Sequence, residues 1–168
     1  MTPRITLATA GRVLAQLRHD HRTLGLLLFV PAALLTLLWW MYEGGPTFDA
    51  IGPALLALFP FIGMFLVTSV ATLRERTSGT LERLLAMPTG KLDFLLGYAL
   101  AFGLMATLQA LIAAGVAVGL LGLDVAGPTS LLIVVAILDA LLGVALGLFV
   151  SAFAATEFQV VQFMPALV

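Results

Sequence analysis

Residues 74–88 form the polar segment around which the fold is organised, and their sequence is Arg74-Glu75-Arg76-Thr77-Ser78-Gly79-Thr80-Leu81-Glu82-Arg83-Leu84-Leu85-Ala86-Met87-Pro88. The segment lies between stretches apolar enough to cross a bilayer, and it holds three of the eight Lys and Arg residues of the chain. Charged residues between two membrane spans belong in water. We therefore expect the chain to meet a soluble partner at this segment.

The second half of the segment has the sequence pattern of a short helix. Residues 77–79 suit an N-terminal boundary, and Pro88 cannot continue a helix. With Gly79 as the N-cap, the carboxylate of Glu82 can reach a free backbone N–H at the positive end of the helix dipole. About two turns fit between these limits. The apolar residues then share one face, with Glu82 and Arg83 turned away from it: Leu81, Leu84 and Leu85.

The composition indicates a membrane protein. Apolar residues make up 61% of the 168 positions and charged residues only 10%, against about 45–50% and about 25% in soluble domains. Soluble helices have apolar stripes and are not apolar all round. The net charge is −1 with no run of basic residues, so nucleic acid is not an expected partner. The absence of cysteine excludes disulfides and cysteine-based metal sites.

Long apolar runs predict an all-α, polytopic membrane fold in a single transmembrane domain. Four complete transmembrane helices are expected, followed by the start of a fifth: 24–42, 51–73, 94–123, 131–155 and 158–168. Residues 74–91 form the loop between the second and third spans. Pro31 and Pro60 are expected to kink their helices, with neighbouring groups bonding the freed carbonyls.

Residues 1–22 carry four arginines and have leucine or alanine at helical spacing, at Leu7, Ala10, Leu14 and Leu17. This pattern predicts an amphipathic helix at the membrane interface before the first span. The alternative is a frayed basic N-terminus that only sets orientation.

The basic residues also predict the orientation. All eight lie before the first span or between the second and third spans, and none lies in the other two loops: Arg4, Arg12, Arg18, Arg22, Arg74, Arg76, Arg83 and Lys91. Because cytoplasmic loops are enriched in Lys and Arg, the N-terminus and residues 74–91 are expected in the cytoplasm.

Polar and small residues within the spans are further candidates. An ionisable group near a helix centre costs about 2.5–3.5 kcal/mol to insert, so Asp139 should face protein or a wet cavity. It could hold a proton or contact a cationic substrate, or it could be a structural acid bonded to a neighbouring helix, for instance through Gln109. Two glycine pairs at four-residue spacing would allow close helix packing: Gly115 with Gly119, and Gly143 with Gly147.

The segment resembles the cytoplasmic loop of the type-2 ABC exporter permeases, the membrane-spanning subunits of bacterial ATP-binding-cassette drug, antibiotic and polysaccharide exporters. The resemblance rests on Arg74-Glu75-Arg76, Gly79-Thr80-Leu81-Glu82, Leu84-Leu85 and Pro88, and continues through Gly97, Gly143, Gly147, Ser151, Thr156-Glu157-Phe158-Gln159 and Pro165. The family has six spans per permease, so the resemblance implies that this chain is C-terminally truncated.

The resemblance also implies a function. It implies a non-catalytic permease subunit in the bacterial inner membrane, with ATP and Mg bound by a separate ATPase subunit and no cofactor on this chain. It further implies a second permease copy and an amphipathic drug, antibiotic or lipid-like substrate. The expected coupling helix sits in a cleft of the ATPase through Arg76, Gly79, Thr80, Leu81, Glu82, Arg83, Leu84 and Leu85.

The residues themselves agree that this chain is not its own motor or an enzyme. It contains no phosphate-loop motif and no dinucleotide fingerprint, and no catalytic or metal-binding constellation is apparent. In the loop, burial of each leucine could contribute about 1.5–3 kcal/mol, whereas an exposed ion pair contributes about 0–1 kcal/mol.

Three alternatives stay open at this point. The leucines could pack against the chain's own bundle, which would make the loop only a connector. The chain could be an ion-coupled secondary transporter that uses Asp139. It could also be a membrane anchor that recruits a soluble protein without transport.

Overall fold

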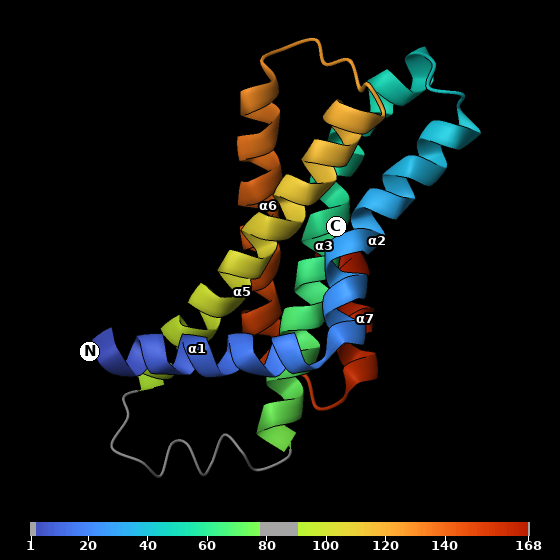
Figure 1. Ribbon diagram of the computed structural model, residues 1–168. Helices are drawn as coiled ribbons and strands as arrows, with labels where there is room; N and C mark the ends of the chain where they lie inside the picture. The colour runs from blue at the N-terminus through green and yellow to red at the C-terminus, as the bar shows by residue number, and fades with distance from the viewer. Residues whose placement is uncertain (1–2, 78–90, 168) are drawn as a thin grey trace.

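The computed structural model describes residues 3–77 and 91–167, and every regular element within them is a helix (Figure 1). In chain order these are α1 (Pro3–His19), α2 (His21–Met41), α3 (Pro46–Thr77), α5 (Lys91–Ala114), the π-helical turn η1 (Gly115–Leu120), α6 (Thr129–Ser151) and α7 (Glu157–Leu167). The all-α prediction is confirmed. The short helix expected between residues 80 and 87 lies outside the described residues.

Four of these helices are long and apolar enough to cross a membrane: α2, α3, α5 together with η1, and α6. Their bounds differ from the predicted spans mainly at the ends, since α3 begins five residues before the predicted start and continues to Thr77. The helical part of the third span ends at Leu120, three residues before the predicted end. The prediction of four complete membrane-spanning helices is confirmed.

The first helix, α1, lies across one end of the bundle, which is called the α1 end below (Figure 1). Asp20 separates α1 from α2 because it caps α2: its Oδ1 accepts a hydrogen bond from the Thr23 backbone N–H at 3.1 Å. Ala10 and Val13 are the buried residues of α1. The helix lies against α5 so closely that a side chain at Gly97 would meet Thr9.

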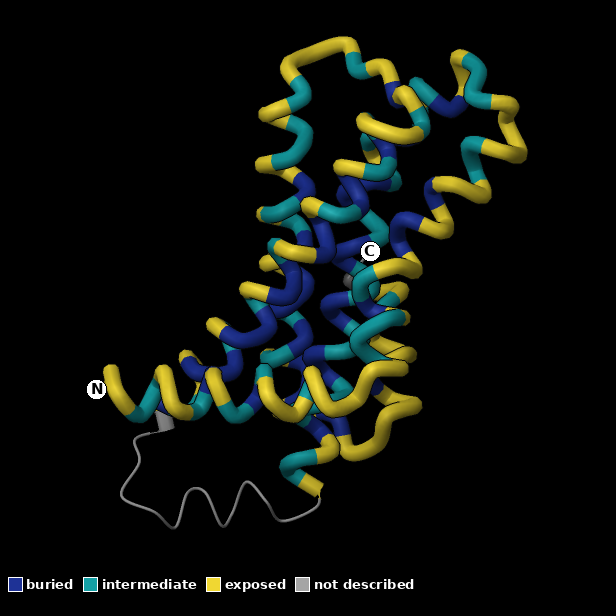
Figure 2. The backbone as a smooth tube through the Cα atoms, viewed as in Figure 1, coloured by how far each residue is buried: buried dark blue, intermediate teal, exposed yellow. Residues whose placement is uncertain are grey.

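Helix α5 packs against α1, α2, α3 and α6. Its middle part is largely buried (Figure 2), and several of its alanine side chains are fully covered. None of these side chains is exposed: Ala101, Ala106, Ala110 and Ala113. Small side chains let the neighbouring helices approach the α5 backbone, which is how helices pack where lipid removes the hydrophobic driving force.

The outer surfaces of the spans are apolar. Large side chains on α2, α5 and α6 are exposed over more than half of their area, for example Phe29, Leu37, Leu104, Leu138 and Phe149. A water-soluble monomer rarely exposes so continuous an apolar surface. Together with the length of the spans, this surface fits a multi-pass membrane protein.

Candidate functional site at the α1 end

The last turn of α3 forms the first part of the polar segment 74–88, and Arg76 on this turn binds the connection that follows α6. Its guanidinium donates hydrogen bonds to the backbone carbonyls of Ala152, at 2.5 Å, and of Ala154. These residues follow the last residue of α6, Ser151. The Ala152 carbonyl, at the C-cap of α6, lies at the negative end of the helix dipole, whereas Ala154 belongs to the connection beyond the helix. Arg76 therefore ties the end of α3 to the connection between α6 and α7.

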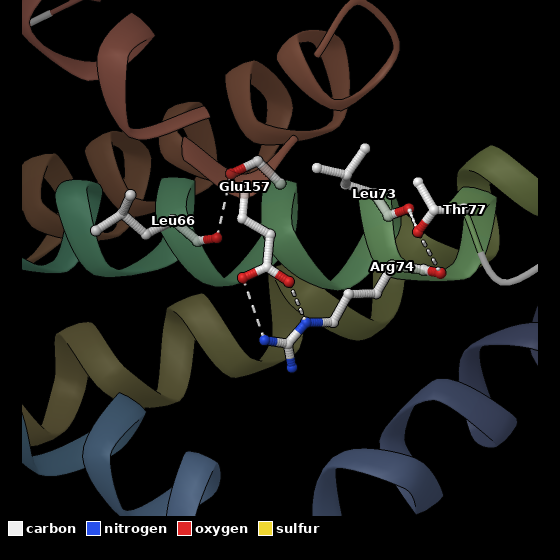
Figure 3. Close-up of polar contacts among 6 residues, drawn as sticks. Leu66, Leu73, Arg74, Thr77 and Glu157 are labelled. Carbon is white, nitrogen blue, oxygen red and sulfur yellow. Dashed lines mark hydrogen bonds and ion pairs between the residues drawn. The ribbon is translucent and has the colours of Figure 1, made fainter. Parts of the chain in front are cut away.

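Arg74 makes a second link from the same turn, to Glu157 at the start of α7 (Figure 3). Its Nε lies 2.6 Å from Oε1 of Glu157, and Nη2 lies 3.3 Å from Oε2. The hydrogen bond from Arg74, with its positive charge, lowers the pKa of Glu157. Both side chains are at least half exposed, so solvent screens the pair and its contribution to stability is small.

A third set of contacts joins α1 to α3 and α5. Arg12 lies 3.1 Å from the carboxylate of Glu75 and donates a 2.8 Å hydrogen bond to the hydroxyl of Tyr98. Near the start of α1, the hydroxyl of Thr6 lies 3.3 Å from the carboxylate of Asp93, which is 4% exposed. The sequence analysis did not find these pairs, because their members are 63 to 87 positions apart.

These contacts surround the two helix ends that lead into and out of residues 78–90. The end of α3 is bound to α1 through Glu75, and to the α6–α7 connection and α7 through Arg76 and Arg74. The start of α5 is bound to α1 through Asp93. The other predicted coupling residues lie outside the described part of the chain: Gly79, Thr80, Leu81, Glu82, Arg83, Leu84 and Leu85.

Within the spans, Gln109 has a different partner from the one that the sequence suggested. Its Nε2 donates a 2.6 Å hydrogen bond to the Leu27 carbonyl of α2, and the side chain is fully buried. That carbonyl is four residues before Pro31, and proline has no N–H with which to bond it. Gln109 thus replaces the hydrogen bond that Pro31 removes. Asp139 is half-buried on α6, and within the described ranges it has no hydrogen bond or ion pair with Gln109 or any other residue.

The two glycine pairs lie in different surroundings. Gly143 and Gly147 are buried against α3, where an added Cβ would collide with the Phe61 carbonyl and would lie 2.8 Å from the Phe65 carbonyl. Gly115 and Gly119 belong to η1 and are exposed, and an added Cβ there would meet no described atom within 4 Å. Among the described residues, the pair Gly143 and Gly147 packs closely against another helix, and the pair Gly115 and Gly119 does not.

The described residues contain no group of three or more His, Asp or Glu side chains placed to hold a metal ion. The polar contacts of the α1 end instead join helix ends to one another. Such contacts are suited to holding or transmitting a position.

Comparison with known proteins identifies one matching family and two curated relatives that share one name. The family model described as ABC-2 type transporter matches residues 8–168. Two curated relatives, both called "Probable multidrug ABC transporter permease YbhR", come from Escherichia coli strain K12 and Escherichia coli O157:H7. Each is 32% identical over 120 residues, which cover 68% of this chain and 33% of the relative. This chain thus spans about a third of their length. No solved structure matches it significantly.

Proposed function

Because this chain belongs to the ABC-2 type transporter family, and so is a membrane subunit of an ABC transporter, we propose that it works as an export permease driven by a partner ATPase. In this proposal ATP and Mg are bound by the partner, and a second permease copy completes the transmembrane pathway. The relatives are described as multidrug permeases, which supports an amphipathic small molecule as the substrate.

The distribution of charge supports a cytoplasmic position for the α1 end, in the inner membrane of a bacterium. Six of the eight basic residues lie on α1, at the start of α2 or in the last turn of α3: Arg4, Arg12, Arg18, Arg22, Arg74 and Arg76. In the loops at the other end, the charged residues are acidic: Glu43 and Asp124. This asymmetry is typical of a cytoplasmic N-terminus.

The observation that carries the proposal is the set of links around residues 78–90. A force applied to this segment acts on the end of α3 and the start of α5. Arg76 and Arg74 carry the displacement of α3 to the α6–α7 connection and α7, while Glu75 carries it to α1. Closure of a partner ATPase on the segment would therefore move several elements together, as rigid-body transitions require.

Docking of the segment would depend on its leucines. Burial of each leucine against the partner could contribute about 1.5–3 kcal/mol. This is more than an exposed ion pair of the neighbouring charges contributes. Leu81, Leu84 and Leu85 would supply affinity, while Glu82 and Arg83 would set the register of the contact.

Affinity purification of the tagged chain in mild detergent, with mass spectrometry of the retained proteins, tests this proposal. We expect a phosphate-loop ATPase with the parent and its loss from the Leu81→Asp/Leu84→Asp variant. A Ser78→Asp/Ala86→Asp variant adds the same charge outside the leucine face and should retain the ATPase. If the parent retains no ATPase, or if both variants lose it equally, docking through the leucine face is refuted.

A further inference from the structure

The side of α1 that is turned away from the bundle carries a groove, beside the corner where α1 meets α2. Its volume is about 560 Å³, within the range of about 300–1,000 Å³ that is typical of sites for organic ligands. Small or apolar residues line one part of it, and arginine and histidine side chains line the other: Gly11, Leu14, Ala15, Arg18, His19 and His21. Gly11 and Arg18 lie about two helical turns apart, on the side of α1 opposite the buried Val13. The groove therefore faces the surroundings of the protein.

The groove lies at the depth where a bilayer has its head groups. Helix α1 lies across the end of the bundle, and the first span, α2, begins directly after it (Figure 1). Arg22 is in the first turn of α2, and the same side of that helix continues with apolar side chains, Leu26 at 65% and Phe29 at 61% exposure. Exposed side chains of this kind are stable among acyl chains, so Arg22 and the groove before it lie beside the adjoining head groups.

The arginines of residues 18–22, which are called the α1–α2 corner below, differ from those that hold the helix ends together. Arg12 and Arg74 each pair with a glutamate. In contrast, Arg18 and Arg22 are exposed, and their side chains form no ion pair or hydrogen bond with any residue in the ranges 3–77 and 91–167. Both guanidinium groups are therefore left to bind a ligand from outside the chain.

Asp20 is the acid of the corner, and it offsets part of this charge. Its oxygens accept hydrogen bonds from the hydroxyl and the backbone N–H of Thr23, and these bonds lower its pKa, as does the charge of Arg22 to a smaller extent. Asp20 lies on the other side of the corner, where it borders α3. Two arginines against one aspartate leave the corner with a net positive charge while both histidines are neutral, and protonation of either histidine increases it. The ligand with complementary charge is an anion.

We propose that the α1–α2 corner binds an anionic phospholipid of the adjoining leaflet, with its phosphate at Arg18 and Arg22 and its upper acyl carbons over Gly11 and Ala15. A guanidinium presents N–H donors in a fork that matches phosphate oxygens. An added Cβ at Gly11 would meet no described atom within 4 Å, so there is room for the lipid along α1. The apolar part of the groove and its depth favour a lipid over a soluble phosphate compound. Lipid binding here holds α1 at the membrane surface, and it does not rest on the proposed function.

Native mass spectrometry of the full chain in mild detergent tests the proposal, with phosphatidylglycerol and phosphatidylcholine of identical acyl chains titrated separately. Phosphatidylcholine has no net charge, so it reports binding through the acyl chains alone. We expect the parent to bind phosphatidylglycerol more tightly. The variant Arg18→Gln/Arg22→Gln should weaken phosphatidylglycerol binding by about fivefold for each arginine, the contribution of one basic residue near an anionic lipid surface. Its affinity for phosphatidylcholine should not change.

Two matched variants separate the charge of the corner from the charge of α1 as a whole. Arg18→Lys/Arg22→Lys keeps both charges and should keep the preference for phosphatidylglycerol. Arg4→Gln removes a charge about 21 Å from Arg18 along the helix axis and should leave the affinity unchanged. Because Arg18 lies in the last turn of α1, where a positive charge also stabilises the helix, circular dichroism should confirm that each variant remains helical.

Three results would overturn the proposal: equal affinity of the parent for the two lipids, unchanged phosphatidylglycerol binding in Arg18→Gln/Arg22→Gln, or displacement of the lipid by an equal concentration of glycerol phosphate. The last result would assign the corner to a soluble phosphate compound, because glycerol phosphate has an anionic head and no acyl chain. No ATPase is present in this experiment, so failure here leaves the docking proposal intact. Loss of the ATPase contact would likewise leave lipid binding unchanged.

Discussion

Replacing Gln109 by methionine should destabilise the bundle by about 1 kcal/mol in the parent, and by much less when Pro31 is also replaced by alanine. Gln109 donates to the Leu27 carbonyl at 2.6 Å, and both residues are less than 5% exposed. Without Gln109 that carbonyl has no donor, because Pro31 cannot supply one. In Pro31→Ala the new N–H can bond the carbonyl within α2, so Gln109 is no longer needed.

The magnitude follows from two opposing contributions. An orphaned buried acceptor costs about 1–3 kcal/mol. Against this, Oε1 of Gln109 is a buried acceptor with no partner among the described residues. Replacing Gln109 by methionine removes this oxygen and so relieves an energetic cost that the parent carries. Side-chain hydrogen bonds in membrane bundles contribute about 0.6 kcal/mol on average and about 1.7 kcal/mol at most. These values together give about 1 kcal/mol.

Unfolding in mixed micelles by increasing sodium dodecyl sulfate measures this free energy. Trp39 and Trp40 at the end of α2 provide the fluorescence signal. Leu108→Met on the exposed face of α5 is a matched control and should change little. The reasoning is refuted if Gln109→Met costs the same free energy with proline and with alanine at position 31.

Three further predictions concern other contacts. Gly143→Ala should destabilise the same unfolding transition by more than about 1 kcal/mol, because its methyl group meets the α3 backbone, while Gly119→Ala should be neutral or slightly stabilising; equal effects would contradict the packing described. Arg76→Met should cost about 1 kcal/mol in that assay, because the carbonyl of the buried Ala154 loses its donor while that of the exposed Ala152 can bond water instead, and an unchanged midpoint would contradict this role of Arg76. Thr23→Val should raise the pKa of Asp20 toward 3.8, observed by NMR titration of its carboxyl carbon. Since the folded pKa is lowered, the stabilisation of α2 is present above the ordinary pKa of aspartate and is lost as the pH falls through the folded value; a pKa that does not change in the variant would contradict the assigned cause.

The contacts around Arg76 and Glu75 bear on how movement could pass between elements. Arg76 bonds backbone carbonyls, which move only with the α6–α7 connection itself. Glu75 pairs with Arg12 at 15% exposure of its side chain, so this pair is better shielded from water than the pair of Arg74 with Glu157. We therefore expect Arg76 and Glu75, and not Arg74, to dominate the links of α3 to its neighbours.

The sequence by itself determined the membrane class, the number of long spans and the concentration of basic residues beside residues 74–88. These features depend on composition and on the distance between residues along one helix, which a single chain displays directly. Pro31 likewise indicated that a carbonyl of α2 would need a donor from outside its helix.

Only the tertiary structure decided which residues meet. Gln109 is 82 positions from Leu27, and its predicted contact with Asp139 is absent from the described residues, because the rotation of α5 directs its side chain toward α2 and α3. The glycine pairs have the same spacing, yet Gly143 lies against α3 and Gly115 lies in η1 on the exposed surface. Spacing shows that a helix face is small or polar. The neighbour that covers this face is fixed by how all the helices pack together, and this decides whether the face becomes a contact.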